Sequence, residues 1–242
     1  MLGDSGGVSI GELSRRLLIS KHSVRRLVTT LQEMGYVAER HDDSFALTIK
    51  LFELGAKVLP NLDLARLADA PMREIAESSR ETVHLGARSG DQIVYMHTIS
   101  SAYGLRMQSV IGSTNPLYST AIGKALLAWS DAGEARAILS NVEFNHRTPH
   151  TLVSLEAVMD ALPAIREQGF SEDNEEQEQG LRCIAAPVFD YTGAVVAALS
   201  ISAPTTRFTD ARREGHLASL REAARSISEQ LGFRSYPMKG QA

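Results

Sequence analysis

The sequence predicts an α+β protein with a small helical domain over residues 1–50, linker helices over residues 51–80 and a larger domain over residues 81–242. Three observations lead to this prediction. Before Gly35, apolar residues recur at helical spacing in two short stretches. From Thr82 onward, consecutive runs show the alternation typical of strands with one buried face. Short polar turns join these runs, so the sheet of the larger domain should be mainly antiparallel.

Composition restricts the class of protein. The chain has 242 residues, of which 43% are apolar, and it contains no apolar run long enough to span a membrane. Its first residues also lack the basic and apolar pattern of a secretory signal. We therefore expect a cytoplasmic protein with no membrane partner. The single cysteine, Cys183, allows neither an intrachain disulfide nor a cysteine-based zinc cluster.

Charge is unevenly distributed along the chain. The net charge is −4, but residues 1–50 contain seven Lys/Arg and six Asp/Glu, a balance of +1, and the remainder contains 18 and 23, a balance of −5. A strongly basic nucleic-acid-binding protein is excluded. Any contact with DNA is therefore expected in the first domain.

Two helices and a hairpin are expected in the first domain. Residues 9–17 begin with a capping box, because Ser9 and Glu12 can each accept from the other's backbone N–H. A second helix starts after Ser20 and ends at Gly35, and its apolar residues follow the i, i+3, i+4, i+7 pattern at Val24, Leu27, Val28 and Leu31. Residues 36–40 and 45–49 flank a polar turn. This order is that of a winged helix-turn-helix.

The face of the second helix opposite its apolar stripe is suited to the major groove of DNA. It offers cations for phosphates and polar side chains for base edges. The candidate DNA-binding residues are Ser20, Lys21, His22, Ser23, Arg25, Arg26 and Thr29, with Arg40 from the hairpin. The alternative is an ordinary solvated helix face. Asp42 and Asp43 at the hairpin tip oppose DNA binding, because carboxylates repel phosphates.

One element of the motif is missing from its expected place. A helix-turn-helix needs a preceding helix to cover the apolar residues of the two that follow, and only eight residues precede Ser9. Either the true start lies upstream, or these residues pack on something else. The residues concerned are Leu13, Leu17, Leu27 and Leu31.

Helices and strands of the remaining chain follow from the same patterns. Residues 51–59 and 64–79 should form the linker helices, and strands are expected at 82–87, 92–99, 105–110, 183–189 and 195–202. Further helices are expected at 121–129, 132–139, 155–168 and 210–231. The acidic segment 171–181 has the composition of a solvated loop.

Several polar residues of the larger domain could form a site for a small anion. The helix beginning at Ala121 is expected to be capped by Ser119 or Thr120, which leaves the amides of Ala121 and Ile122 available to an anion. Ser200 and Ser202 alternate with apolar residues, so their hydroxyls share one face of a strand. These features have ordinary alternatives: a routine helix start, and hydroxyls bonded to backbone.

Several motifs together resemble the IclR family of bacterial transcription regulators. They are SKHSVRRL at residues 20–27, KLFELG at 50–55, PLYSTAIGKA at 116–125, GLRCIA at 180–185 and LSIS at 199–202. The resemblance implies a winged-helix domain and a GAF-like α/β effector-binding domain, working as a homodimer or homotetramer on a double-stranded DNA operator. It also implies an effector pocket formed by residues matching Ala121, Ile122, Asp173, Cys183, Ser200 and Ser202.

Within the family, the sequence is similar to regulators of pectin and hexuronate breakdown that respond to 2-keto-3-deoxygluconate. Residues 51–56, 105–107, 115–124 and 172–178 carry this similarity. It implies a repressor of sugar-acid catabolism controlled by a small carboxylate. Arg106 is a second candidate for the carboxylate, and Met107 is a further candidate effector contact. Ala121-Ile122 replaces the Gly-Ala of relatives that bind smaller ligands, which leaves the identity of the effector open.

Two other functions are compatible with the sequence. An enzyme would use Cys183 as nucleophile with His84 or His97 as base, but no motif connects these residues. A sensor without DNA binding is the other alternative. We assign no catalytic residue, no metal ligand and no cofactor.

Overall fold

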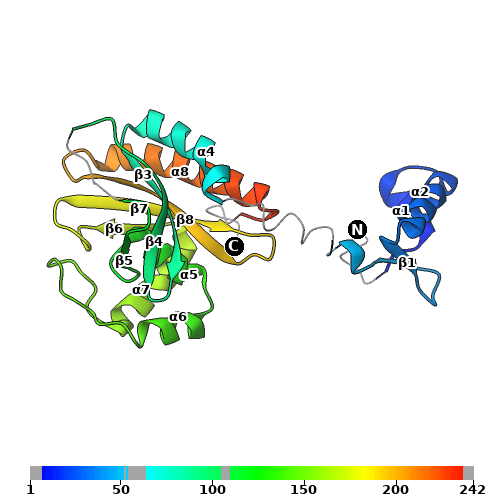
Figure 1. Ribbon diagram of the computed structural model, residues 1–242, viewed down its shortest axis with the longest axis horizontal. Coiled ribbons are helices and arrows are strands. Elements are labelled where there is room, and N and C mark those ends of the chain that lie inside the picture. Colours follow the sequence, from blue (N-terminus) through cyan, green and yellow to red (C-terminus); the bar gives the residue numbers. More distant parts are fainter. Residues whose placement is uncertain (1–6, 52, 54–63, 105–109, 237–242) are drawn as a thin grey trace. The chain divides into compact units, whose positions relative to one another are not determined.

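The computed structural model describes residues 7–51, 53, 64–104 and 110–236, and it divides into two compact units, residues 1–63 and 64–242 (Figure 1). The sequence predicts that residues 51–80 link the two domains. The division falls at residue 63 instead, and the helix that follows belongs to the second unit. The linker helix expected at 51–59 lies almost entirely outside the described residues.

The first unit contains the predicted helix, turn, helix and hairpin. These are α1 (Ile10–Leu17), α2 (Lys21–Glu33), β1 (Val37–Glu39) and β2 (Phe45–Leu47). Ser9 and Ser20 cap the helices by accepting from backbone N–H groups three residues on. Glu12 pairs with Arg16 rather than completing the capping box.

A small apolar core holds the first unit together. It is formed by Val8, Leu13, Val24, Val28, Val37 and Phe45. Among the four leucines expected to need cover, Leu13 is buried and Leu31 packs against the core. Leu17 and Leu27 are 43% and 56% exposed. The core therefore uses only part of the apolar surface of the two helices.

A six-stranded sheet forms the centre of the second unit, in the order β5-β4-β3-β8-β7-β6. All five neighbouring pairs are antiparallel, which confirms the predicted sheet type. The strands are β3 (Thr82–Ser89), β4 (Gln92–Ile99), β5 (Thr114–Pro116), β6 (Ser171–Asn174), β7 (Leu181–Phe189) and β8 (Val195–Pro204).

Helices cover both faces of this sheet (Figure 1). One face carries α4 (Leu64–Ser79) and α8 (Asp210–Gln230), which pack on residues such as Leu199 and Ile201 of β8. The other carries α5 (Ala121–Trp129) with α6 (Ala132–Leu139) and α7 (Leu155–Gln168) beyond it. The sheet therefore separates two apolar cores, and the polar residues of interest lie on the α5 side.

Two strands differ from expectation. The segment 171–181 begins with β6, an edge strand paired with β7, rather than forming a solvated loop throughout. β5 was not predicted, and the strand expected at residues 105–110 falls almost entirely outside the described residues. Both observed strands are short and polar, so neither shows the alternation of a half-buried strand.

Candidate ligand cavity and nucleic-acid interface

The pairing of the strands aligns polar side chains on the α5 side of the sheet. Asp173 of β6 lies opposite Cys183 of β7, which lies opposite Ser202 of β8. Ser200 lies opposite Ala185, a residue of the core against α5. Directly opposed residues of antiparallel strands project from the same face. Asp173, Cys183, Ser200 and Ser202 therefore share the face that α5 covers.

These residues line one cavity together with the start of α5. All six effector-pocket residues that the resemblance implies border this cavity. Its full lining is Ile93, Tyr95, Thr120, Ala121, Ile122, Asp173, Gln177, Leu181, Cys183, Ser200 and Ser202. Arg106 and Met107 lie outside the described residues. About 280 Å³ of the cavity is free of atoms, yet the centre of a water molecule fits in only about 10 Å³ of it. This conformation has room for about one water.

The first turn of α5 supplies the cavity with backbone donors. Thr120 is the N-cap, and its hydroxyl accepts from the amide of Gly123 at 3.1 Å. Among the described residues, the amides of Ala121 and Ile122 have no such partner. A Cβ at Gly123 would lie 2.2 Å from the carbonyl oxygen of Leu117, so glycine is required for this close approach of helix and preceding chain. Ala121 and Ile122 thus keep two donors beside the cavity.

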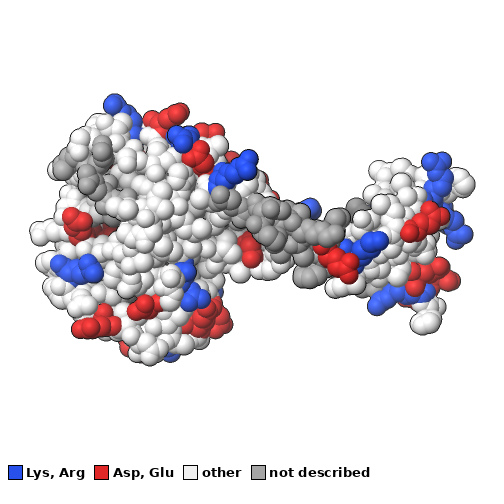
Figure 2. All heavy atoms as spheres, in the orientation of Figure 1, with Lys and Arg blue, Asp and Glu red and all other residues white. Residues whose placement is uncertain are grey.

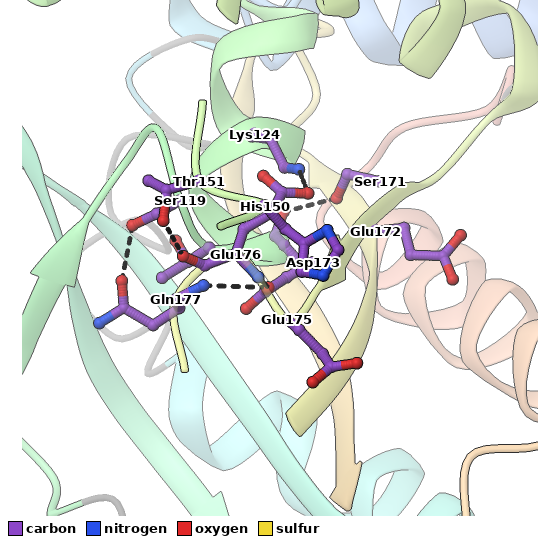
Figure 3. A network of polar contacts seen from close by, with 12 residues as sticks. Ser119, Lys124, His150, Thr151, Ser171, Glu172, Asp173, Glu175, Glu176 and Gln177 are labelled. Atoms are coloured by element: carbon purple, nitrogen blue, oxygen red, sulfur yellow. Dashed lines mark hydrogen bonds and ion pairs between the residues drawn. The ribbon is translucent and has the colours of Figure 1, made fainter. Parts of the chain in front are cut away.

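A loop at the edge of the cavity, residues 175–180, contributes Gln177 to its lining, and we call this segment the cover loop. Figure 3 shows its polar contacts with the residues around it. Asp173 Oδ1 accepts from the amides of Glu176 and Gln177 at 2.7 and 3.2 Å. The Gln177 side chain accepts from Ser119 at 2.6 Å and donates to Asn115 at 2.9 Å. Asp173 is therefore already occupied by the loop, so a ligand that needs this carboxylate must share it or release the loop.

Two threonines and a buried ion pair hold the cover loop as well. Thr148 and Thr151 donate to the carbonyls of Glu175 and Glu176 at 2.5 and 2.7 Å. Lys124 of α5 forms an ion pair with Oε1 of Glu176, and the two side chains are only 5% and 12% exposed. The other carboxylate oxygen of Glu176 is buried with no partner within the described chain. The loop is thereby attached directly to the helix that begins at the cavity.

Burial controls the charge of the cavity. It raises the pKa of Asp173 from 3.8 to about 7, against the opposing effect of the Glu176 amide that donates to it. Asp173 therefore changes charge near neutral pH. Burial also raises the pKa of the Cys183 thiol well above its usual value, so the thiol stays neutral. A neutral buried thiol is a poor nucleophile.

The two histidines considered as catalytic bases lie in different settings. His97 Nε2 lies 2.8 Å from Asp69 Oδ1 of α4, on the opposite side of the sheet from the cavity. His84 is fully buried, and desolvation lowers its pKa from 6.5 to about 3. Neither forms a hydrogen bond with Cys183 in the part of the chain described. In the described ranges, no group of three or more His, Cys, Asp or Glu side chains is placed to hold a metal.

All eight candidate DNA-binding residues are exposed on the first unit. Ser20 and Ser23 are engaged with each other at the start of α2, with 2.9 Å between their hydroxyl oxygens. Asp42 accepts from Ser44, and this lowers the pKa of its carboxyl, so the hairpin tip is anionic. In Figure 2, Lys and Arg side chains stand on this unit with Asp and Glu among them. Basic and acidic side chains are therefore interspersed on this unit, and the basic candidates Lys21, Arg25 and Arg26 lie on α2.

Sequence reasoning missed part of the cavity. Lys124, Glu176 and Gln177 were not singled out, although the first lies one turn after Ala121 in the same helix. Glu176 and Gln177 belong to an acidic run that has the composition of a solvated loop, and their partners are more than fifty residues away. Tyr95 and Ile93 carried no signal beyond strand propensity.

Family comparisons match both units. The sequence model described as "Bacterial transcriptional regulator IclR C-terminal" matches residues 56–229, and that of the MarR family matches residues 1–44. Within the described chain, no helix is both long and apolar enough to cross a membrane.

Named relatives and solved structures agree with the family match. The HTH-type transcriptional regulator KdgR of Escherichia coli K12 is 53% identical over 98% of this chain and 90% of its own length. The HTH-type transcriptional repressor AllR of the same strain is 33% identical over 96% of this chain and 86% of its own length. The crystal structure of the Thermotoga maritima IclR has a TM-score of 0.69 at 32% identity, over 96% of this chain and 94% of that one.

Proposed function

This chain belongs to the IclR family of bacterial transcriptional regulators, and we propose that it is a repressor of sugar-acid catabolism that leaves its DNA operator when a small carboxylate such as 2-keto-3-deoxygluconate binds. The observation that carries the proposal is the cavity at the start of α5, which gathers backbone donors, hydroxyls and a carboxylate. The similarity to a regulator named as the transcriptional repressor AllR supports the repressor function. The class of effector is what the resemblance carried by residues 51–56, 105–107, 115–124 and 172–178 implies.

The chemistry of the cavity fits a hydroxylated 2-keto acid. The effector carboxylate would accept from the amides of Ala121 and Ile122, where the partial positive charge of the helix N-terminus favours an anion. Ser200 and Ser202 offer hydroxyls to the rest of the ligand. Asp173 would accept from ligand hydroxyls rather than hold the ligand's charge. An acid with hydroxyls along its chain uses all three kinds of group.

Ligand entry requires a change at the cover loop. A six-carbon acid does not fit in a space that holds about one water. Displacing Glu176 and Gln177 from Asp173 would enlarge the cavity and free the carboxylate at the same time. Effector binding would therefore favour a conformation in which the loop is released from Asp173, and the ligand shifts the population toward it.

DNA binding would use paired α2 helices. A homodimer or homotetramer in the cytoplasm would place two copies of this helix in successive major grooves of a two-fold symmetric operator. Lys21, Arg25 and Arg26 would supply most of the contacts to phosphates and bases. Light scattering of the purified protein measures the assembly directly.

The test is binding of the full chain to a labelled promoter fragment of a sugar-acid catabolic operon. We expect affinity that falls steeply with salt and falls again when 2-keto-3-deoxygluconate is added. A chain that binds the acid but no promoter fragment at low salt would be a sensor without DNA binding. A chain whose DNA binding ignores the acid would contradict the proposed effector.

A further inference from the structure

We propose that His84 is a specificity-determining residue for the ligand of the cavity, and that its Nε2 forms a hydrogen bond with a hydroxyl of the bound effector. This inference rests on the proposed function and extends it to a residue adjacent to the cavity lining. It concerns the part of the ligand that lies away from the carboxylate.

The position of His84 places it beside the cavity residues. It lies on β3 directly opposite Ser200 of β8, and therefore projects from the same face of the sheet. Its ring packs against the ring of Tyr95, with 4.8 Å between the centroids. Ser200 and Tyr95 both line the cavity. His84 is not part of the lining itself, but it lies opposite one lining residue and packs against another, so it is adjacent to the cavity.

The bonding of His84 is incomplete. Its side chain is fully buried, and Nδ1 lies 3.1 Å from the Thr98 hydroxyl on the neighbouring strand. Nε2 is buried and has no hydrogen-bond partner among the described residues. Buried polar atoms in proteins are nearly always satisfied, because leaving one unpaired is unfavourable. An unpaired ring nitrogen beside a ligand cavity is explained if the ligand is its partner.

The chemistry of the ring selects a hydroxyl rather than the carboxylate. Because desolvation keeps the imidazole neutral, it offers no charge to an anion. The Thr98 hydroxyl can donate to Nδ1 or accept from it, so either tautomer of His84 is compatible with this contact. Nε2 can therefore donate or accept. A hydroxyl, which also does both, is the matching partner, and a short 2-keto acid without hydroxyls leaves Nε2 unpaired.

Two substitutions distinguish a hydrogen bond made by Nε2 of His84 from one made by Nδ1. The amide of glutamine reaches about as far as Nε2, whereas the amide of asparagine reaches only about as far as Nδ1. The experiment measures binding of 2-keto-3-deoxygluconate and pyruvate to the full chain by calorimetry, for the wild type, His84→Asn and His84→Gln. We expect His84→Asn to weaken binding of the hydroxylated acid about tenfold and to leave pyruvate unchanged. His84→Gln should keep most of the preference.

The affinities of the wild type and the two variants for both acids test the role of His84 separately from the proposed effector class. An unchanged preference in His84→Asn, or an equal loss for both acids, overturns the inference while leaving the proposed effector class intact. If the wild type binds neither acid, the proposed effector class fails and this inference fails with it. Should the variants not fold, the ¹⁵N shift of Nε2 in the wild type decides: it must change with 2-keto-3-deoxygluconate and not with pyruvate.

Discussion

Replacing Lys124 by methionine should destabilise the second unit by about 3 kcal/mol. The change removes one partner of the ion pair with Glu176, whose side chain is only 12% exposed. Removing one member of a buried pair leaves the other charge without compensation and costs about 3–5 kcal/mol. We expect the lower end of this range, because Glu176 lies on the cover loop rather than within a helix or strand.

Urea-induced unfolding of the full chain measures this effect. The fluorescence of Trp129, the single tryptophan, reports on this domain, because its ring lies 6.2 Å from that of Phe189 in the core. Arg136→Met is the matched control. Its ion pair with Glu156 joins side chains that are 49% and 66% exposed, and solvent-exposed pairs contribute little to stability, so this variant should unfold much like the wild type.

A double variant tests whether the pair itself is responsible. Lys124→Met combined with Glu176→Leu removes both charges, so it should recover at least about half of the loss seen with Lys124→Met alone. The reasoning is refuted if the single variant loses less than about 1 kcal/mol. The variant Glu176→Leu is also measured by itself, and the reasoning is refuted if the double variant loses as much stability as Lys124→Met and Glu176→Leu added together.

Three further predictions concern the carboxylate, the helix start and the DNA-reading face. Burial raises the pKa of Asp173 from 3.8 to about 7, so the folded chain keeps this carboxyl neutral over a pH range in which the unfolded chain ionises it. As the pH rises from about 4 to about 7, the wild type should therefore lose up to about 4 kcal/mol of stability relative to Asp173→Asn, measured by urea unfolding. A difference that does not depend on pH would contradict this. Gly123→Ala should lower the melting temperature and abolish effector binding, because its Cβ has no space, whereas Gly215→Ala, with no atom within 4 Å, should do neither in a thermal-shift assay. Arg25→Ala should weaken operator binding about tenfold in fluorescence anisotropy, and Arg136→Ala should leave it unchanged; equal effects would argue against the α2 face.

Local signals in the sequence were sufficient for most of the fold. The apolar spacing predicts the bounds of α5, α6 and α7, and a capping residue was expected only for α5, at Ser119 or Thr120. The structure confirms these bounds, with Thr120, Asp131 and Ser154 as N-caps. The hairpin of β3 and β4 followed from two alternating runs and a short turn. These features depend on residues a few positions apart, which is why the sequence alone reveals them.

Features that depend on distant partners were missed. β6 is acidic because Glu172 pairs with Arg182 and Arg213, which come from β7 and α8. The cover loop has a similar composition and is fixed by Lys124, Thr148 and Thr151. An acidic segment is normally exposed to solvent, and only its contacts with residues distant in the sequence show that this one is held against the domain. The alternation of Ser200 and Ser202 was readable, whereas the loop that closes over them was not.

The alternation along β8 has a consequence for how such a regulator can change its specificity. Odd-numbered Leu199 and Ile201 pack under α4 and α8, whereas even-numbered Ser200 and Ser202 border the cavity. Substitutions at even positions can therefore alter the polar lining of the cavity while the opposite core stays intact. Substitutions at the odd positions would instead alter the core under α4 and α8 and leave the cavity lining unchanged. One strand thus holds two separately variable sets of residues, so the chemistry of the cavity can change in this scaffold without first rebuilding the domain.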